Sequence, residues 1–298
     1  MRSTPQTTRG ILFLLAGVFL FACMDSTTKY LTALYPPPLV VAIRYIVHCA
    51  LMLVVLAPSR GMSFARTRRI HLVLVRGACL AGASLCVAVA LQRMPVAETS
   101  AIIFFAPLLV VILAGVVLNE EVGAFGWLAA VAGFAGLLLI ARPGAQLNVV
   151  GVLAALAAAV LNAIYQLLSR VLASTETTLA MLFYTALVGA LAYGAVAPFF
   201  WSGPRPTAWQ AALFLSTGVM AGVAHYFFTA AHRHVPASTL APLQYVQLLW
   251  AGLLGWIAFG HVPDRLSIAG MAIVAAAGAM VAVRSRLAAR ALEQAAET

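Results

Sequence analysis

Apolar residues occur along this chain in ten long blocks, separated by short polar turns. A hydrocarbon core about 30 Å thick needs roughly 20 apolar residues per helical span, and each block is about that long. The pattern therefore predicts ten transmembrane helices. Their expected ranges are 10–31, 38–57, 70–91, 96–117, 123–141, 149–170, 179–200, 208–231, 237–258 and 266–284.

The second half of the chain repeats the first. A shift of 140 residues places Arg93 on Arg233 and aligns the same order of basic residue, apolar helix, polar turn and Gly/Ala-rich helix. Five spans per copy is an odd number, so the second copy enters the membrane from the opposite face. The sequence predicts an all-α integral membrane protein with two five-helix inverted repeats, residues 1–144 and 145–298, the second ending in a short cytoplasmic tail. Such symmetry is typical of secondary transporters.

Composition supports this architecture and sets its orientation. Hydrophobic residues make up 63% of the 298 residues, charged residues 9%, and the mean hydropathy is +1.01. The net charge of +10 does not indicate a nucleic-acid partner, because basic residues in membrane proteins mark the cytoplasmic loops. We expect both termini in the cytoplasm and the protein in the cytoplasmic (inner) membrane of a bacterium. The expected inner set is Arg2, Arg9, Arg60, Arg66, Arg68, Arg69, Arg76, Arg170, Arg233, Arg284, Arg286 and Arg290, and the outer set is Lys29, Arg93, Arg142, Arg205 and Arg265.

The sequence gives little support for an enzyme or a metal-binding protein. The four cysteines lie inside apolar spans, and no pair has the spacing of metal ligands. The chain contains neither a Gly-x-Ser-x-Gly nor a His-Glu-x-x-His motif, and Asp25 is the only aspartate within a predicted span. We expect no enzyme, no cofactor and no metal. The glycine pairs Gly218/Gly222 and Gly252/Gly255 are expected at close helix contacts.

An outer group of polar residues forms one candidate site, since polar side chains at membrane depth are costly and usually face the bundle interior. The group contains Asp25, Lys29, Arg44 and Glu98. Asp25 and Lys29 are four residues apart and share one helix face, and Arg44 lies deepest in its span. We expect a gate of ion pairs or capture of a zwitterion's two charges. Static ion pairs, or side chains that reach to the outer interface, are the structural alternative.

A central group forms the candidate binding surface. Its members are Phe104, Phe105, Asn162, Tyr165, His225, Tyr226, Gln244, Gln247 and Trp250. The 140-residue shift pairs Phe104 and Phe105 with Gln244 and Tyr245, so one half offers aromatic rings and the other adds amide and hydroxyl groups. Such a lining suits a planar apolar group with a polar head, and interhelical hydrogen bonding is the alternative. His225 is a candidate for proton coupling or a packing residue.

The segment 91–144 carries a further pattern. Pro95 and Ala97 open a helix, Pro107 lies within it, Asn119-Glu120 follows it, and a Gly/Ala-rich helix ends in Arg142-Pro143, with a second copy from Pro236 to Arg284. The pattern resembles the EamA-type branch of the drug/metabolite transporter superfamily, although Gly260-His261 stands where that family leads us to expect Gly-Glu. Within the branch, the chain most resembles the YddG-type exporters of aromatic amino acids. The resemblance implies a ten-helix carrier that moves amino acids, and some toxic organic cations, outward without ATP.

These observations favour a secondary transporter that exports aromatic and other neutral amino acids by alternating access, as a monomer or weak dimer. Because central carboxylates are few, gradient-driven or weakly coupled transport is favoured. A carrier of the same fold for a nucleotide sugar or a phosphorylated compound is the alternative, which would favour several basic residues in the cavity. An intramembrane enzyme is the rival class.

Overall fold

Helices make up nearly all of the computed structural model, which describes residues 5–117, 124–142, 147–172, 174–201, 205–234 and 243–296. The helices are α1 (Pro5–Thr32), α2 (Pro37–Arg60), α3 (Ile70–Arg93), α4 (Val96–Ile103), α5 (Ala106–Val117), α6 (Ala124–Ile140), α7 (Val149–Leu172), α8 (Thr178–Val196), α9 (Ala208–His234), α11 (Val246–Phe259) and α12 (Arg265–Ala296), with short 3₁₀ helices at Gly61–Ala65 and Ala197–Phe200.

The described helices confirm an all-helical membrane protein. Among the residues that the structure describes, six helices are long and apolar enough to cross a membrane, and four shorter apolar helices supply the other predicted spans. The start of the predicted span 237–258 lies outside the described residues. Helix α12 continues without a break to Ala296, through the described part of the expected tail.

Helix ends follow local residue chemistry. Pro37 begins α2, where its missing N–H costs no hydrogen bond. The side chain of Thr177 accepts a hydrogen bond from the backbone N–H of Ala180 and so caps α8. Gly260 ends α11 with a φ of 66°, a left-handed conformation that glycine adopts without strain.

The fourth and ninth spans are interrupted at equivalent positions. Between α4 and α5, Phe104 and Phe105 form a turn. In the second copy, Tyr245 lies in a turn directly before α11. The 140-residue shift pairs Phe105 with Tyr245. Discontinuous helices at corresponding places in two inverted copies commonly frame the substrate site of secondary transporters.

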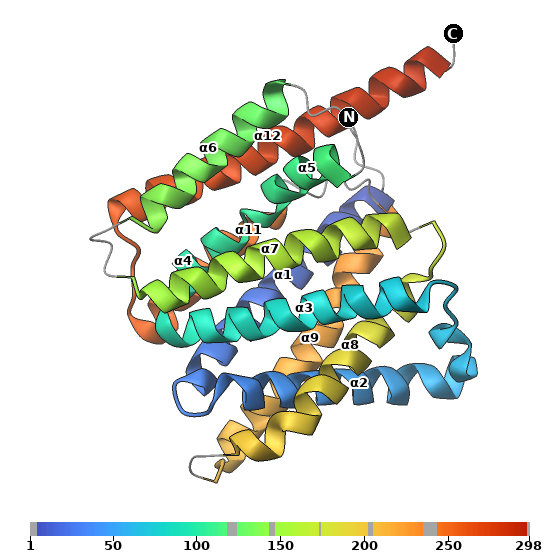
Figure 1. The fold of residues 1–298 in the computed structure, drawn as a ribbon, viewed down its shortest axis with the longest axis vertical. Coiled ribbons are helices and arrows are strands. Elements are labelled where there is room, and N and C mark those ends of the chain that lie inside the picture. Colours follow the sequence, from blue (N-terminus) through green and yellow to red (C-terminus); the bar gives the residue numbers. More distant parts are fainter. Residues whose placement is uncertain are drawn as a thin grey trace.

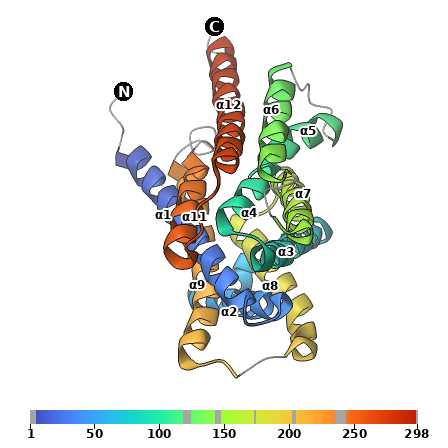
Figure 2. The ribbon, with the colours of Figure 1, turned by 90° about the vertical axis from the view of Figure 1, so that its left-hand side faces the viewer.

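The two copies are intertwined rather than side by side (Figure 1). Helix α1 packs along α9 and α11, while α7 packs along α3, α4 and α5, so the first helix of each copy lies against the other copy. The equivalent helices α2 and α8 pair with each other, as do α6 and α12. Figure 2 shows the α6–α12 pair at the opposite edge of the molecule from α2 and α8. If one copy moves relative to the other, α1 or α7, which packs against the opposite copy, must therefore slide or move with that copy.

Glycines bring some of these helices into backbone contact. A Cβ atom at Gly136 would lie 2.8 Å from the Gly270 carbonyl oxygen, and one at Gly270 would lie 2.6 Å from the Gly136 carbonyl oxygen. Gly218 likewise lies against Val47. Among the residues that the structure describes, a Cβ atom at Gly252 or Gly255 would meet nothing within 4 Å, so the expectation of close packing was wrong for this pair.

Candidate functional site

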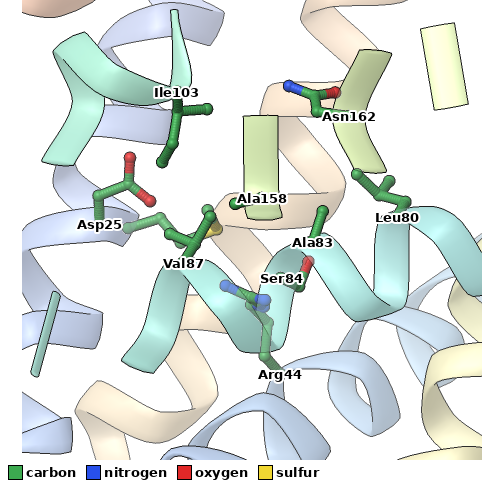
Figure 3. Close-up of a pocket in the computed structure, with 10 residues that line it drawn as sticks. Asp25, Arg44, Leu80, Ala83, Ser84, Val87, Ile103, Ala158 and Asn162 are labelled. Carbon is green, nitrogen blue, oxygen red and sulfur yellow. The ribbon is translucent and has the colours of Figure 1, made fainter. Parts of the chain in front are cut away.

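A cavity of about 100 Å³ lies where α1, α2, α3, α4 and α7 meet (Figure 3). Because α7 belongs to the second copy, the cavity lies between the copies. Its lining combines the polar residues Asp25, Arg44, Ser84 and Asn162 with Met24, Leu80, Ala83, Val87, Ile103 and Ala158. Mostly apolar walls with a few convergent polar groups are typical of small-molecule sites. The cavity is smaller than the roughly 300–1,000 Å³ of pockets for larger ligands, so this conformation suits a small head group.

Arg44 is the cation of this cavity. Arg44 is 5% exposed, and its Nη2 atom is buried without a hydrogen-bond partner among the described residues. The guanidinium carbon lies 5.5 Å from the centre of the Tyr45 ring. A buried guanidinium with an unused donor is suited to bind an anionic oxygen that enters the cavity.

Asp25 is the anion of the same cavity. The Gln247 side-chain amide on α11 donates a hydrogen bond of 3.4 Å to its Oδ2 atom. In the described part of the chain, the ion pairs join other residues, namely Arg142 with Asp264 and His261 with Glu98. Asp25 and Arg44 therefore line one cavity without neutralising each other by direct contact. Both charges remain available to a ligand.

The predicted outer group is thus divided. The Lys29 ammonium does not pair with Asp25 but donates to the backbone carbonyls of Leu91 (3.0 Å) and Met94 (2.7 Å), where it caps the carboxyl end of α3. Glu98 is buried in the first turn of α4, and its Oε1 atom lies 2.9 Å from Nε2 of His261.

The structure also separates the predicted central group. Asn162 lines the cavity, and Gln247 reaches it through Asp25. The Phe104 ring lies 5.2 Å from the Tyr245 ring, so the two helix interruptions touch each other. Phe105 is instead buried in the core among residues of α6 and α12.

Two other members of the central group lie elsewhere. Trp250 packs against Phe19 on α1, with ring centres 4.9 Å apart. Gln244 is half-buried beside the second interruption. Neither lines the cavity.

His225 and Tyr226 are neighbours in sequence with opposite environments. The His225 ring stacks on His48 of α2, with centres 6.1 Å apart and planes 8° apart, and it meets the edge of Phe21. The Tyr226 side chain is 60% exposed on the outside of the bundle. The structure therefore joins two histidines inside the bundle and leaves Tyr226 outside the cavity.

Arg76 lies deeper in the bundle than the sequence predicted. It was assigned to the cytoplasmic loop set, yet the structure buries it within α3 at 4% exposure. Its guanidinium donates to Tyr165, Ser169 and Thr185 side chains and to the Met181 carbonyl. Tyr165 is thus engaged by Arg76 rather than facing the cavity alone. The available signal was depth, since Arg76 lies nearly two turns into the span predicted from residue 70.

Comparison with known proteins agrees with this architecture. The model of the EamA-like transporter family matches residues 8–142 and again residues 149–283, once in each copy. A crystal structure with 23% sequence identity superimposes with a TM-score of 0.64 over 98% of both chains, which shows a shared fold.

Several bacterial transporters are similar to this chain. An S-adenosylmethionine uptake transporter of Rickettsia prowazekii is 27% identical over 72% of each chain. The pseudopaline exporter CntI of Pseudomonas aeruginosa is 28% identical over 90% of this chain and 94% of its own. A riboflavin transporter of Vibrio cholerae is 27% identical over 89% of this chain and 90% of its own.

Proposed function

Because the chain belongs to the EamA-like transporter family, we propose that it is a secondary transporter that exports amino acids, aromatic and other neutral ones, across the cytoplasmic membrane. The family membership identifies a multi-pass membrane transporter of small metabolites and not an enzyme. The amino-acid cargo and the outward direction are the proposal.

The observation that carries the proposal is the pair of opposite charges in one cavity. Asp25 offers a carboxylate and Arg44 a guanidinium with an unused donor. An α-amino acid carries an ammonium and a carboxylate on the same carbon atom, so it supplies both missing partners at once. The cavity volume of about 100 Å³ suits such a head group. A charged ligand group also offsets part of the cost of keeping each protein charge away from water.

The apolar surroundings favour a cargo with a large side chain. Ile103 lines the cavity and directly precedes Phe104, whose ring contacts Tyr245. Aromatic rings at that position suit the packing of a planar group. The compounds in the names of two relatives support a cargo of this type. S-adenosylmethionine combines an amino-acid head with a planar ring system, and riboflavin carries a planar ring system.

Nucleotide sugars and phosphorylated compounds fit the cavity less well. Arg44 is the single cation among the described residues of its lining, and Asp25 would repel a phosphate from the same space. Toxic organic cations remain compatible with Asp25 as their partner. These compounds therefore belong in the experiment as competing cargoes.

Alternating access provides the mechanism for this transport. At the outer end, Glu98 of the first copy contacts His261 of the second copy. Arg142 of the first copy likewise contacts Asp264 of the second copy. These contacts must separate for the cavity to open outward. The interrupted helices at Phe104 and Tyr245 place deformable backbone next to the cavity.

The experiment uses purified protein in liposomes without an imposed proton gradient. Uptake of radiolabelled tryptophan, phenylalanine, threonine, glutamate, UDP-glucose and an organic dication is followed for the wild type, Asp25→Asn and Arg44→Gln. We expect saturable uptake of the neutral amino acids, and a loss of about tenfold or more in each variant, since a hydrogen bond to a charged group contributes about 1.5–3 kcal/mol.

The matched control is Arg66→Gln, which changes an exposed arginine in the loop between α2 and α3 and should transport like the wild type. Transport of UDP-glucose or the dication in place of amino acids would refute the proposed cargo. Normal amino-acid transport by Asp25→Asn and Arg44→Gln would refute the proposed site.

A further inference from the structure

Arg76 is a cation enclosed by neutral partners. Its Nη1 atom donates to the Met181 carbonyl and the Thr185 hydroxyl, each at 3.0 Å. Its Nη2 and Nε atoms each donate at 2.7 Å, to the hydroxyls of Tyr165 and Ser169. Among the described residues, no carboxylate lies within ion-pair distance of Arg76. The charge therefore lacks a counter-ion in this part of the protein.

A helix clamp does not by itself require that charge. Taking an ion out of water costs several kcal/mol, and hydrogen bonds to neutral groups recover only part of it. A neutral amide could donate to two of these hydroxyl and carbonyl groups at a smaller desolvation cost. Ionisable residues within membrane spans usually mark the path of a substrate or ion.

The position of Arg76 relates it to the cavity. Leu80 on α3 and Asn162 on α7 line the cavity. Arg76 precedes Leu80 by four residues and Tyr165 follows Asn162 by three, so each lies on the same helix face as its lining residue. Since α3 and α7 run in opposite directions (Figure 1), both steps lead toward the cytoplasmic end, by about 5–6 Å.

The two side chains meet at that level. The Arg76 guanidinium carbon lies 4.2 Å from the centre of the Tyr165 ring, and Nη2 donates to the Tyr165 hydroxyl. The Arg76–Tyr165 pair thus lies about one helical turn from the lining residues Leu80 and Asn162, toward the cytoplasmic end. The four hydrogen bonds of Arg76 use four of its five N–H groups, which leaves one on Nη2.

We propose that Arg76 and Tyr165 form an entry gate, at which Arg76 binds the carboxylate of the cargo before the cargo reaches Arg44. The gate rests on the amino-acid cargo of the proposed function. When the Tyr165 side chain withdraws, both N–H groups of Nη2 become available to the carboxylate, and a path opens from the cytoplasmic side toward Leu80 and Asn162 of the cavity. The arriving carboxylate supplies the counter-ion that Arg76 otherwise lacks.

The test measures KM for phenylalanine from each face of the membrane, with inverted and right-side-out vesicles that contain the full chain. We expect Arg76→Gln to raise KM at the cytoplasmic face about tenfold, the loss expected for one hydrogen bond to a charged group. KM at the outer face should change by less than about twofold, because Arg44 and Asp25 remain. Arg76→Lys should recover part of the affinity, and the exposed control Arg66→Gln should match the wild type.

Phenethylamine, which lacks the carboxylate, separates binding from folding. Its inhibition constant at the cytoplasmic face should be unchanged in Arg76→Gln. Tyr165→Phe keeps the ring and removes the hydroxyl that occupies Nη2, so it should lower KM for phenylalanine at that face. This variant also tests the gate if Arg76→Gln does not fold.

The outcomes distinguish the two proposals. Equal changes of KM at both faces, or a lower unfolding temperature with unchanged KM in both Arg76→Gln and Tyr165→Phe, would identify a structural clamp and overturn the gate alone. Failure of the wild type to transport any amino acid would overturn the proposed function and the gate with it.

Discussion

At the residue scale, the side of the helix on which a polar group lies determines its role. His225 and Tyr226 are adjacent, yet the first stacks on His48 inside the bundle and the second is 60% exposed outside it. Arg44 and Arg76 are both buried, yet one has an unused donor in a cavity and the other is held by four hydrogen bonds. Residue type and depth alone do not separate these cases.

Gln247 and Tyr226 provide a test at this scale. Gln247→Leu removes the hydrogen bond to Asp25 and should raise KM for the proposed amino-acid cargo about three- to tenfold. The lower end of this range reflects the hydrogen-bond length of 3.4 Å. Tyr226→Leu changes an outward-facing side chain and should leave KM unchanged. Uptake by reconstituted protein measures both. A larger effect of Tyr226→Leu than of Gln247→Leu would contradict the placement of the cavity.

At the element scale, glycines and helix interruptions control how the helices meet. The α6–α12 pair joins equivalent helices of the two copies through the reciprocal contact of Gly136 and Gly270. The interruptions at Phe105 and Tyr245 relate the fourth and ninth spans in the same way. Inverted symmetry is therefore visible in backbone geometry even where side chains differ.

The glycine contacts predict a contrast between two substitutions of the same kind. Gly136→Ala places a methyl group 2.8 Å from a backbone oxygen that cannot move alone, and overpacking of this type costs about 1–3 kcal/mol. Gly252→Ala meets nothing within 4 Å and should be neutral. Thermal unfolding in detergent compares the variants. Equal unfolding temperatures for Gly136→Ala and the wild type would refute the close approach of α6 and α12.

At the scale of the whole molecule, polar contacts join the two copies at both ends of the bundle. Glu98–His261 and Arg142–Asp264 lie at the outer end. At the cytoplasmic end, Glu176 of the second copy accepts hydrogen bonds from the backbone N–H groups of Arg68 and Arg69, at the start of α3. The alternating access that we propose would break these two sets of contacts in turn.

Glu176 makes the cytoplasmic contacts dependent on pH. Burial alone would raise its pKa, but the Thr67 side chain together with the backbone N–H groups of Arg68 and Arg69 outweighs that effect and holds the pKa below its usual 4.5. A carboxyl with a lowered folded-state pKa stabilises the protein above its usual pKa, and this stability is lost as pH falls through the folded value. Glu176→Gln should therefore lower the unfolding temperature at pH 7, and the difference from wild type should shrink below about pH 4.5. A difference that stays constant with pH would exclude this linkage.

The sequence by itself determined the ten spans, the all-helical class and the duplication. These features depend on local properties of the chain, because about 20 consecutive apolar residues require a membrane span wherever they occur. The resemblance to the EamA-type family also followed from local patterns, and the family match in both copies confirmed it. Asp25, Arg44 and Asn162 were candidates from depth and residue type alone.

Only the tertiary structure decided which candidates meet. It brought Asp25, Arg44 and Asn162 into one cavity, directed Lys29 to the carboxyl end of α3 and turned Tyr226 outward. Helical periodicity sets the angle between residues of one helix. The rotation of that helix about its axis, and the neighbour that it faces, depend on packing between distant segments such as α1 with α9 and α3 with α7. Because these packed segments are far apart in the sequence, the cavity and the Arg76–Tyr165 pair could not be predicted from the sequence alone.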